Sequence, residues 1–156
     1  MSEKKTGSLF ELCFEISCLI SDDYLQFKPQ FKKIGRNLGV IFQMQDDILE
    51  MSTSSENMGK GTNSDIERSK KTILSSMALD QDKDAWNDLQ EEIKNRSIVE
   101  KKELLKEYYK NSGIIEKSKE LLLNFDNKCK DIIKSLPSEV QDNMISLLNM
   151  ILKREK

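Results

Sequence analysis

The chain has 156 residues, of which 33% are charged and 37% hydrophobic, and its formal net charge is −2. This composition allows one domain with a lean core, and the near-neutral charge without a basic block argues against a nucleic-acid partner. No apolar run approaches the roughly 18 residues of a membrane-spanning helix, and Glu11 and Glu15 interrupt the apolar stretch near the N-terminus, which argues against a secretory signal.

The segment from about residue 6 to residue 20 is predicted to be a helix, and the whole chain is predicted to be all-α. Only two prolines and six glycines punctuate the sequence, and no strict alternation or hairpin signal indicates a strand. The helix has a broad apolar face made of Leu9, Leu12, Cys13, Ile16, Leu19 and Ile20. Cys13, Cys18 and Cys129 have no metal-ligand spacing, and an odd number of cysteines fits a reducing compartment, so we expect a cytoplasmic protein.

The second helix is predicted to follow the polar turn Ser-Asp-Asp at residues 21–23, which is a plausible N-cap region. Pro29 would lie in its first turns, where the missing N–H costs little, and the helix would continue to about Met51. Gly35 and Gly39 inside it cost roughly 1 kcal/mol each in helix propensity relative to Ala. Either a neighbouring helix or a ligand tail comes close at these glycines, or the helix simply tolerates them.

An acidic stripe is the most informative feature of this second helix. Gln43, Asp46, Asp47 and Glu50 are spaced i, i+3, i+4 and i+7, so they line one side of the helix within an apolar stretch. Crowded carboxylates repel one another, and partial burial raises that cost, so a cation is expected to offset it. Oxygen ligands without His or Cys suit Mg²⁺. The alternative is a solvated acidic face without a ligand.

The remainder of the chain is predicted to be one loop followed by further helices. Residues 52–64 are small, polar and glycine-bearing, which predicts a functional loop at about 52–69. The alternative is a floppy linker without a functional role. Helices are expected near 83–96, 99–111, 113–135 and, after Pro137, 138–153. Trp86, Tyr108 and Tyr109 are interpreted as packing anchors, and the lysines from Lys101 to Lys110 as a mixed-charge solvated face.

The stripe and its neighbours resemble the trans-isoprenyl diphosphate synthases, also called polyprenyl synthetases. Phe42-Gln43-x-x-Asp46-Asp47-x-x-Glu50 resembles their second aspartate-rich motif, Gly-x-x-Phe-Gln-x-x-Asp-Asp-x-x-Asp. Other pieces follow in family order: Lys5-Thr6, Gly59-Lys60, Ser64-Asp65, Lys70-Lys71-Thr72 at the start of the next helix, Ser112-Gly113-Ile114 and Leu136-Pro137. The resemblance covers nearly the whole chain, and it implies that residues 1–156 form the C-terminal half of the isoprenoid synthase helical bundle.

Two residues and one motif depart from the family pattern. Glu50 stands where the family usually has Asp, and Ser69 replaces the usual Gly before Lys70. The first motif, Asp-Asp-x-x-Asp, is absent from the chain, as are the upstream groups that hold isopentenyl diphosphate, and the chain has no His. We therefore expect a truncated gene, a split enzyme or a dedicated subunit.

The resemblance implies specific roles in prenyl transfer, in which an allylic diphosphate loses pyrophosphate and isopentenyl diphosphate attacks the resulting cation. Mg²⁺ would be held by Asp46, with Asp47 and Glu50 supporting the metal or orienting lysines. Lys5, Lys60 and Lys70 would neutralise diphosphate charge. Thr6 and Gln43 would offer hydrogen bonds near the reacting groups, and Phe42 would pack against substrate. Each lysine, taken alone, is as well explained as a surface charge.

Three functional hypotheses remain. The first is the metal-binding half of a prenyl diphosphate synthase, a prenyltransferase that is inactive without the missing N-terminal half. The second is a regulatory subunit that docks on a full-length partner as a homo- or hetero-oligomer. A third, another class of terpenoid enzyme, is disfavoured by Phe-Gln-x-x-Asp-Asp. The isolated chain is expected to be poorly stable or to self-associate, because Ile41, Phe42 and Leu49 would be exposed without their facing helices.

Overall fold

A computed structural model describes residues 6–52 and 71–153 of the chain, and within these ranges the structure is helical, without a strand. This confirms the all-α prediction. The elements in chain order are α1 (Ser8–Ile20), the 3₁₀ helix η2 (Asp22–Phe27), α2 (Lys28–Ser52), α4 (Ile73–Gln81), α5 (Lys83–Ile93), α6 (Ile98–Asn111), α7 (Ile114–Ile133) and α8 (Ser138–Leu152). The chain divides into two compact units, residues 1–45 with 120–156, and residues 46–119.

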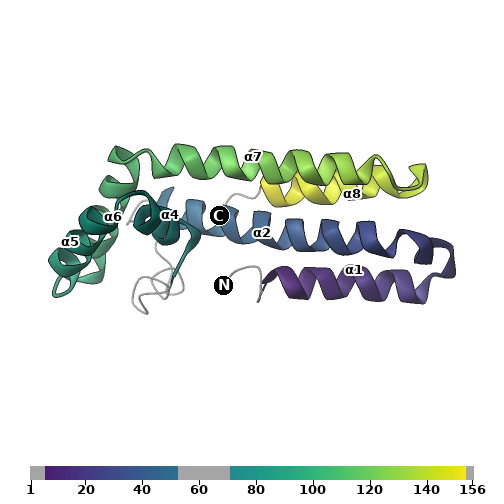
Figure 1. Ribbon diagram of the computed structural model, residues 1–156, viewed down its shortest axis with the longest axis horizontal. Helices are drawn as coiled ribbons and strands as arrows, with labels where there is room; N and C mark the ends of the chain where they lie inside the picture. The colour runs from purple at the N-terminus through teal and green to yellow at the C-terminus, as the bar shows by residue number, and fades with distance from the viewer. Residues whose placement is uncertain (1–5, 53–70, 154–156) are drawn as a thin grey trace. The chain divides into compact units, whose positions relative to one another are not determined.

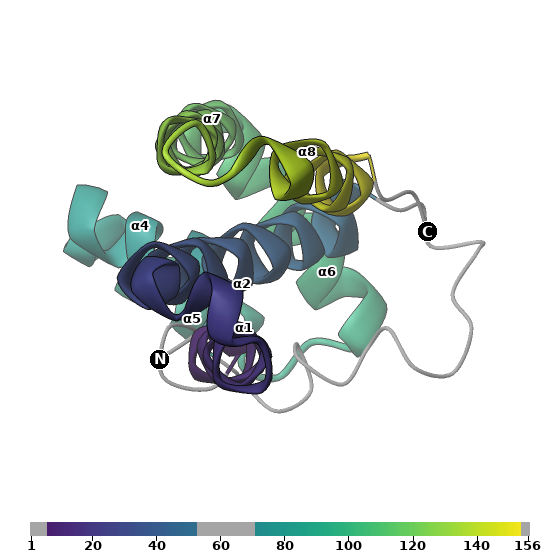
Figure 2. The same cartoon turned by 90° about the vertical axis from the view of Figure 1, so that its right-hand side faces the viewer.

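The first unit contains α1, η2, most of α2, the later part of α7, and α8. These helices lie alongside one another in both views (Figures 1 and 2). Pro29 lies in the first turn of α2, as predicted. Ser21 stands at the N-cap position of the 3₁₀ helix η2, which leads into α2, and its side chain makes no capping bond. The core of this unit is apolar and consists of Cys18, Phe31, Ile34, Leu38, Ile41, Cys129, Ile133, Leu136, Leu148 and Ile151.

Helices α1 and α2 cross at a very short distance, which decides between the two interpretations of the glycine pair. A Cβ atom added to Gly39 would lie 2.4 Å from the Cα of Gly7, and one added to Gly35 would lie 2.8 Å from the carbonyl oxygen of Phe10. Only glycine leaves room for backbone to approach backbone in this way. The close approach of a neighbouring helix therefore explains both glycines.

The face of α1 that packs inward differs from the prediction. Phe10, Phe14 and Cys18 pack with the core, whereas the predicted apolar face is exposed. The exposed side chains are Leu9, Leu12, Ile16, Leu19 and Ile20, each 45–81% exposed. We call these five residues the α1 stripe. No described element covers the α1 stripe because α2 packs on a different side of α1.

Ion pairs explain why α1 turns its acidic side toward α2. Glu11 contacts Lys32 at 3.1 Å and Arg36 at 3.0 Å, and Glu15 contacts Lys28 at 2.8 Å. The nearby cations hold the pKa of both glutamates below the ordinary value, with the hydrogen bonds from Lys32 and Lys28 as the largest causes. Both glutamates therefore serve the α1–α2 contact.

The second unit contains the end of α2, then α4, α5 and α6, and the start of α7. Each new helix begins at a capping side chain: Thr72 for α4, Asp82 for α5 and Ser97 for α6, and these caps satisfy N–H groups that have no partner inside a helix. Gly113 has a φ of +70°, a left-handed conformation suited to glycine, and separates α6 from α7. The helix bounds agree with the predicted segments.

Aromatic packing holds the second unit together, as predicted for Trp86, Tyr108 and Tyr109. The Trp86 and Tyr109 rings stack at a centroid distance of 6.0 Å, and Tyr108 lies 5.9 Å from Trp86. The predicted solvated face of α6 was wrong at Lys102, which is only 1% exposed. Lys102 shares the inward side of α6 with Leu105 and Tyr109, at i, i+3 and i+7. In the part of the chain that is described, no helix is both long and apolar enough to cross a bilayer.

Candidate functional site

Two predicted site residues meet in the first unit. The Thr6 hydroxyl donates to the Oε1 atom of Gln43 at 3.3 Å, although the two residues are 37 positions apart. The Gly7–Gly39 approach holds the backbone beside them at close range. Thr6 and Gln43 are therefore neighbours because α1 and α2 cross without intervening side chains.

Phe42 packs beside this pair. Its ring centroid lies 5.8 Å from that of Phe10, and both side chains are partly buried against the core. Ile41 is fully buried and Phe42 and Leu49 are only partly accessible, so the expectation that these three would be exposed was wrong. The physical reason for Ile41 is that it faces the core shared with α7 and α8.

The carboxylates of the acidic stripe have different surroundings in the second unit. Asp46 is partly exposed, whereas Asp47 is 2% exposed and Glu50 is 8% exposed. All three offer only oxygen atoms as ligands. Asp46 thus has the best access to a ligand from outside the protein, and Asp47 and Glu50 lie mainly within it.

Asp47 makes a contact that the sequence did not indicate. Its Oδ2 atom accepts a hydrogen bond from the backbone N–H of Ile73 at 2.8 Å, across 26 residues. Ile73 is the first residue of α4, where N–H groups have no partner in the helix and where the helix dipole favours a negative charge. Asp47 therefore stabilises the start of α4.

Thr72 and Ser75 form a capping box just beside this contact. The Thr72 Oγ1 atom accepts from the Ser75 N–H at 3.1 Å, and the Ser75 Oγ atom accepts from the Thr72 N–H at 2.9 Å. The Lys-x-Thr piece of the family pattern thus ends at a well-defined helix start, as the resemblance implied. Lys71 precedes the cap and is exposed.

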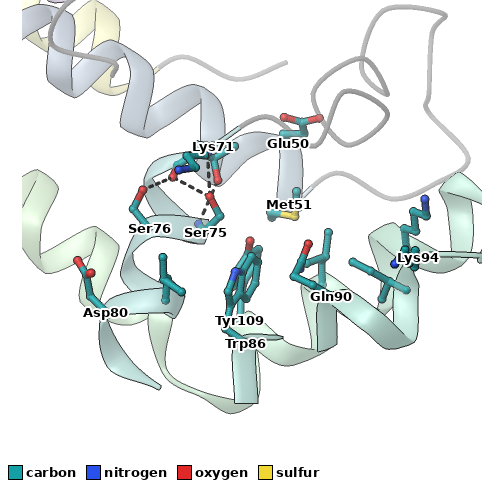
Figure 3. A pocket seen from close by; sticks show the side chains of 15 residues that line it. Glu50, Met51, Lys71, Ser75, Ser76, Asp80, Trp86, Gln90, Lys94 and Tyr109 are labelled. Atoms are coloured by element: carbon teal, nitrogen blue, oxygen red, sulfur yellow. Dashed lines mark hydrogen bonds between the residues drawn. The ribbon is translucent and has the colours of Figure 1, made fainter. Parts of the chain in front are cut away.

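A pocket of about 470 Å³ opens next to this helix start. Its lining combines apolar and aromatic side chains with charged ones (Figure 3): Glu50, Met51, Lys71, Thr72, Ser75, Ser76, Leu79, Asp80, Trp86, Gln90, Ile93, Lys94, Lys101, Leu105 and Tyr109. Glu50 and Met51 come from the end of α2, and Trp86 and Tyr109 lie side by side on α5 and α6 (Figure 3). The third carboxylate of the stripe therefore faces a cavity that the sequence did not predict.

Burial dominates the chemistry of Tyr109 in this pocket. Burial raises the pKa of Tyr109 well above its ordinary value, a hydrogen bond with the Thr72 side chain partly opposes the rise, and the charges of Asp47 and Glu50 add to it. The phenol therefore stays neutral at physiological pH. Tyr109 therefore lines the pocket as a neutral hydrogen-bonding side chain.

The described residues contain no cluster of three acidic, cysteine or histidine side chains positioned to hold a metal. Mg²⁺ commonly uses only one or two carboxylates together with substrate phosphates, so the partly exposed carboxylate of Asp46 is a ligand of the kind that fits this ion. Lys5, Lys60 and Lys70, and the predicted loop after Ser52, lie outside the described residues.

Comparisons with known proteins identify relatives of the chain. A sequence model of the family described as polyprenyl synthetase matches residues 1–111. A prenyl transferase of Cyanidium caldarium is 32% identical over 157 residues, which cover 99% of this chain and 47% of the relative.

Solved structures share the same helical architecture. A geranylgeranyl pyrophosphate synthetase from Pyrococcus horikoshii has 28% identity and a TM-score of 0.74, with 99% of this chain and 48% of that chain covered. A geranylgeranyl pyrophosphate synthase from Lactobacillus brevis has a TM-score of 0.78 at 19% identity, covering 98% of this chain and 49% of that one, which shows the fold alone. The chain therefore spans about half the length of these relatives.

Proposed function

Because the chain belongs to the polyprenyl synthetase family, we propose that it supplies the side of a prenyl transfer site that binds Mg²⁺ and diphosphate. The reaction would join isopentenyl diphosphate to an allylic diphosphate with release of pyrophosphate. The three cysteines are free thiols, and Cys18 and Cys129 are buried. Free thiols support a cytoplasmic setting, because the cytoplasm keeps cysteines reduced.

The observation that carries this proposal is the hydrogen bond between Thr6 and Gln43. These residues belong to two separate pieces of the family pattern, Lys-Thr and Phe-Gln-x-x-Asp-Asp. A chance match of either piece would give no reason for the two to touch across 37 residues. Their contact supports one site assembled from both.

The acidic stripe would provide the metal ligands. Asp46 would bind Mg²⁺ directly. Asp47 and Glu50 would support the bound metal without ligating it, or would orient the lysines. Bound Mg²⁺ would neutralise charge on the diphosphate that leaves. Since Glu50 reaches one methylene further than the family's Asp, its carboxylate extends further from α2 than the family's does.

The remaining residues would bind and orient the substrates. Lys5, Lys60 and Lys70 would neutralise diphosphate oxygens as flexible point charges. Thr6 and Gln43 would position polar groups near the reacting carbons, where fixed donors stabilise developing charge. Phe42, supported by Phe10, would provide an apolar wall that keeps water from the reactive centre.

We propose that this 156-residue chain is inactive by itself, because one carboxylate stripe cannot hold all the metal ions that bridge a diphosphate between two motifs. Incubation of the purified chain with labelled isopentenyl diphosphate, an allylic diphosphate and Mg²⁺ tests this, alone and with the other half of the Cyanidium caldarium relative. We expect elongated product only in the mixture. Product from the chain alone would refute inactivity, and no product in either sample would count against the catalytic role.

The α1 stripe favours a second candidate, a subunit that docks on a partner. Five large apolar side chains exposed side by side on one helix form the kind of patch that marks an interaction site. The partner would be a full-length prenyl synthase chain. Light scattering of the chain with and without such a partner tests docking, and a chain that stays monomeric in both samples would exclude it.

A further inference from the structure

We propose that the pocket of the second unit is an accessory binding site for a small amphipathic anion, a molecule with one acidic group on an apolar body. The pocket measures about 470 Å³, which lies within the roughly 300–1,000 Å³ of typical small-molecule sites. Among the described residues proposed for prenyl transfer, only Glu50 lines this pocket. The inference therefore goes beyond the proposed function and does not rest on it.

The floor of the pocket is apolar and aromatic. Met51, Ile93 and Leu105 are buried and line it. The buried rings of Trp86 and Tyr109, which stack on each other at a centroid distance of 6.0 Å, line it as well (Figure 3). A ligand with an apolar body would cover this floor and remove apolar surface from water, which favours binding.

Two lysines give one end of the pocket a positive charge. Lys94 is the C-cap residue of α5, and Lys101 lies at the end of the first turn of α6. Only residues 94–97 separate the two helices, so both lysines belong to the same end of the pocket. Lys94 also pairs with Glu91 at 3.4 Å, but both side chains are mostly exposed, and such pairs are weak enough for Lys94 to exchange this partner for a ligand.

The carboxylates of the pocket are set apart from this end. Figure 3 shows Asp80 across the pocket from Lys94, and Glu50 apart from it on α2. With Lys71 included, three lysines and two carboxylates line the pocket, which favours an anion over a cation. The charges therefore orient an amphipathic anion in one way, with its acidic group at Lys94 and Lys101 and its body over the aromatic floor.

Trp86 gives a direct test, because it is the only tryptophan of the chain and lies on the floor of the pocket. Its fluorescence should change when a ligand occupies the pocket. The probe is octanoate, an amphipathic anion that does not absorb where tryptophan is excited. Two control probes have the same chain length, the neutral octanol and the cationic octylammonium. Each probe is titrated into the full 156-residue chain at neutral pH.

Lysine variants test the charged end of the pocket. Lys101→Met and Lys94→Met remove the charge and keep most of the apolar stem of the side chain. Lys106→Met is the matched control, because Lys106 is also a partly exposed lysine of α6 but does not line the pocket.

We expect saturable binding of octanoate that is about tenfold or more tighter than binding of octylammonium. Lys101→Met should weaken octanoate binding by about threefold or more, because it removes a charged hydrogen-bond donor from a partly exposed site. The double variant of Lys94 and Lys101 should bind octanoate no better than octanol, and Lys106→Met should bind it as the parent chain does.

Three results would overturn the inference: no saturable change in Trp86 fluorescence with octanoate, equal binding of all three probes, or equal losses in Lys101→Met and Lys106→Met. A further titration uses geranyl diphosphate, an allylic diphosphate, without Mg²⁺. If it binds more tightly than octanoate and depends on the same two lysines, the pocket belongs to the site for the reacting diphosphates, and a separate site is excluded. Failure of prenyl transfer in the mixed-halves assay would leave the octanoate result unaffected, so the two failures are distinguishable.

Discussion

Replacing Gly39 with Ala tests whether the α1–α2 crossing is as tight as the structure shows. The added Cβ would lie 2.4 Å from the Gly7 Cα and 2.8 Å from the Gly7 nitrogen, whereas ordinary contact begins at 3.4 Å. The start of α1 would have to move by about 1 Å, and both obstacles are backbone atoms that cannot rotate away. Such overpacking costs about 1–3 kcal/mol, and we expect the upper end.

The helix itself would gain from the substitution, because Ala is favoured over Gly by about 1 kcal/mol. The net loss should therefore be about 2 kcal/mol, which lowers the melting temperature by roughly 4–8 °C in a chain of this size. Thermal unfolding followed by circular dichroism measures it. Gly35→Ala should show a smaller loss, because its Cβ would lie 2.8 Å from the Phe10 carbonyl oxygen.

Lys33→Ala is a suitable control, since Lys33 is exposed on the same helix and its replacement should change stability by less than about 0.5 kcal/mol. A higher melting temperature for Gly39→Ala than for the parent chain would refute the reasoning. It would mean that the higher helix propensity of Ala is not offset by a steric clash at this position.

Three further predictions concern the metal site, the α1 stripe and the thiols. With the other half supplied, Asp46→Ala should abolish turnover and raise the Mg²⁺ requirement, while Glu50→Asp should be tolerated. Equal, small losses from both would mean that the acidic stripe does not bind the metal. The double change Leu12→Lys and Ile16→Lys should reduce self-association measured by light scattering. The melting temperature should stay nearly unchanged, since both side chains are about half exposed. Undiminished association would mean that the copies contact each other through another surface. Burial raises the pKa of the Cys129 thiol from 9.0 to about 12, so the folded chain retains a proton that the unfolded chain loses above pH 9. The free energy of unfolding should therefore fall between pH 9 and 12, and this thiol contributes at most about 1.4 kcal/mol per pH unit to the fall. Cys129→Ala should make this pH dependence less steep in urea titrations. An unchanged pH dependence would contradict its assignment to Cys129.

Much of the fold could be predicted from local signals. The position of Pro29 at the start of α2, the Thr72 and Ser97 caps and the glycine at position 113 determine where helices begin and end, and these signals are visible in the sequence. Element type followed from the same signals, because no segment offered a competing strand pattern.

The choice of buried face could not be predicted for α1. One side of this helix carries large apolar residues such as Leu9 and Leu12, and an apolar side is ordinarily the buried one. The sequence pattern therefore favoured this side as the inner face of α1. The ion pairs of Glu11 and Glu15 with α2, and the glycines that bring the two helices together, reverse that choice. Lys102 is the same case on α6, since a lysine in a charged run gives no sign that its position faces inward.

The candidate site was only partly predictable for a similar reason. The family order of motifs placed Thr6 and Gln43 in one site, and the structure brings their side chains together. The hydrogen bond from Ile73 to Asp47 uses a backbone N–H, which every residue type except proline carries, so no residue pattern in the sequence predicts it. The same holds for the pocket lined by Trp86 and Tyr109, whose walls come from four separate helices.

The α1 stripe also bears on how long the chain would survive in a cell. A row of leucines and isoleucines that no described element covers offers a binding surface to chaperones, and it raises the chance that two copies aggregate. Proteolytic quality control removes chains that stay in this condition. The abundance of the chain would then follow how often the α1 stripe becomes covered after synthesis.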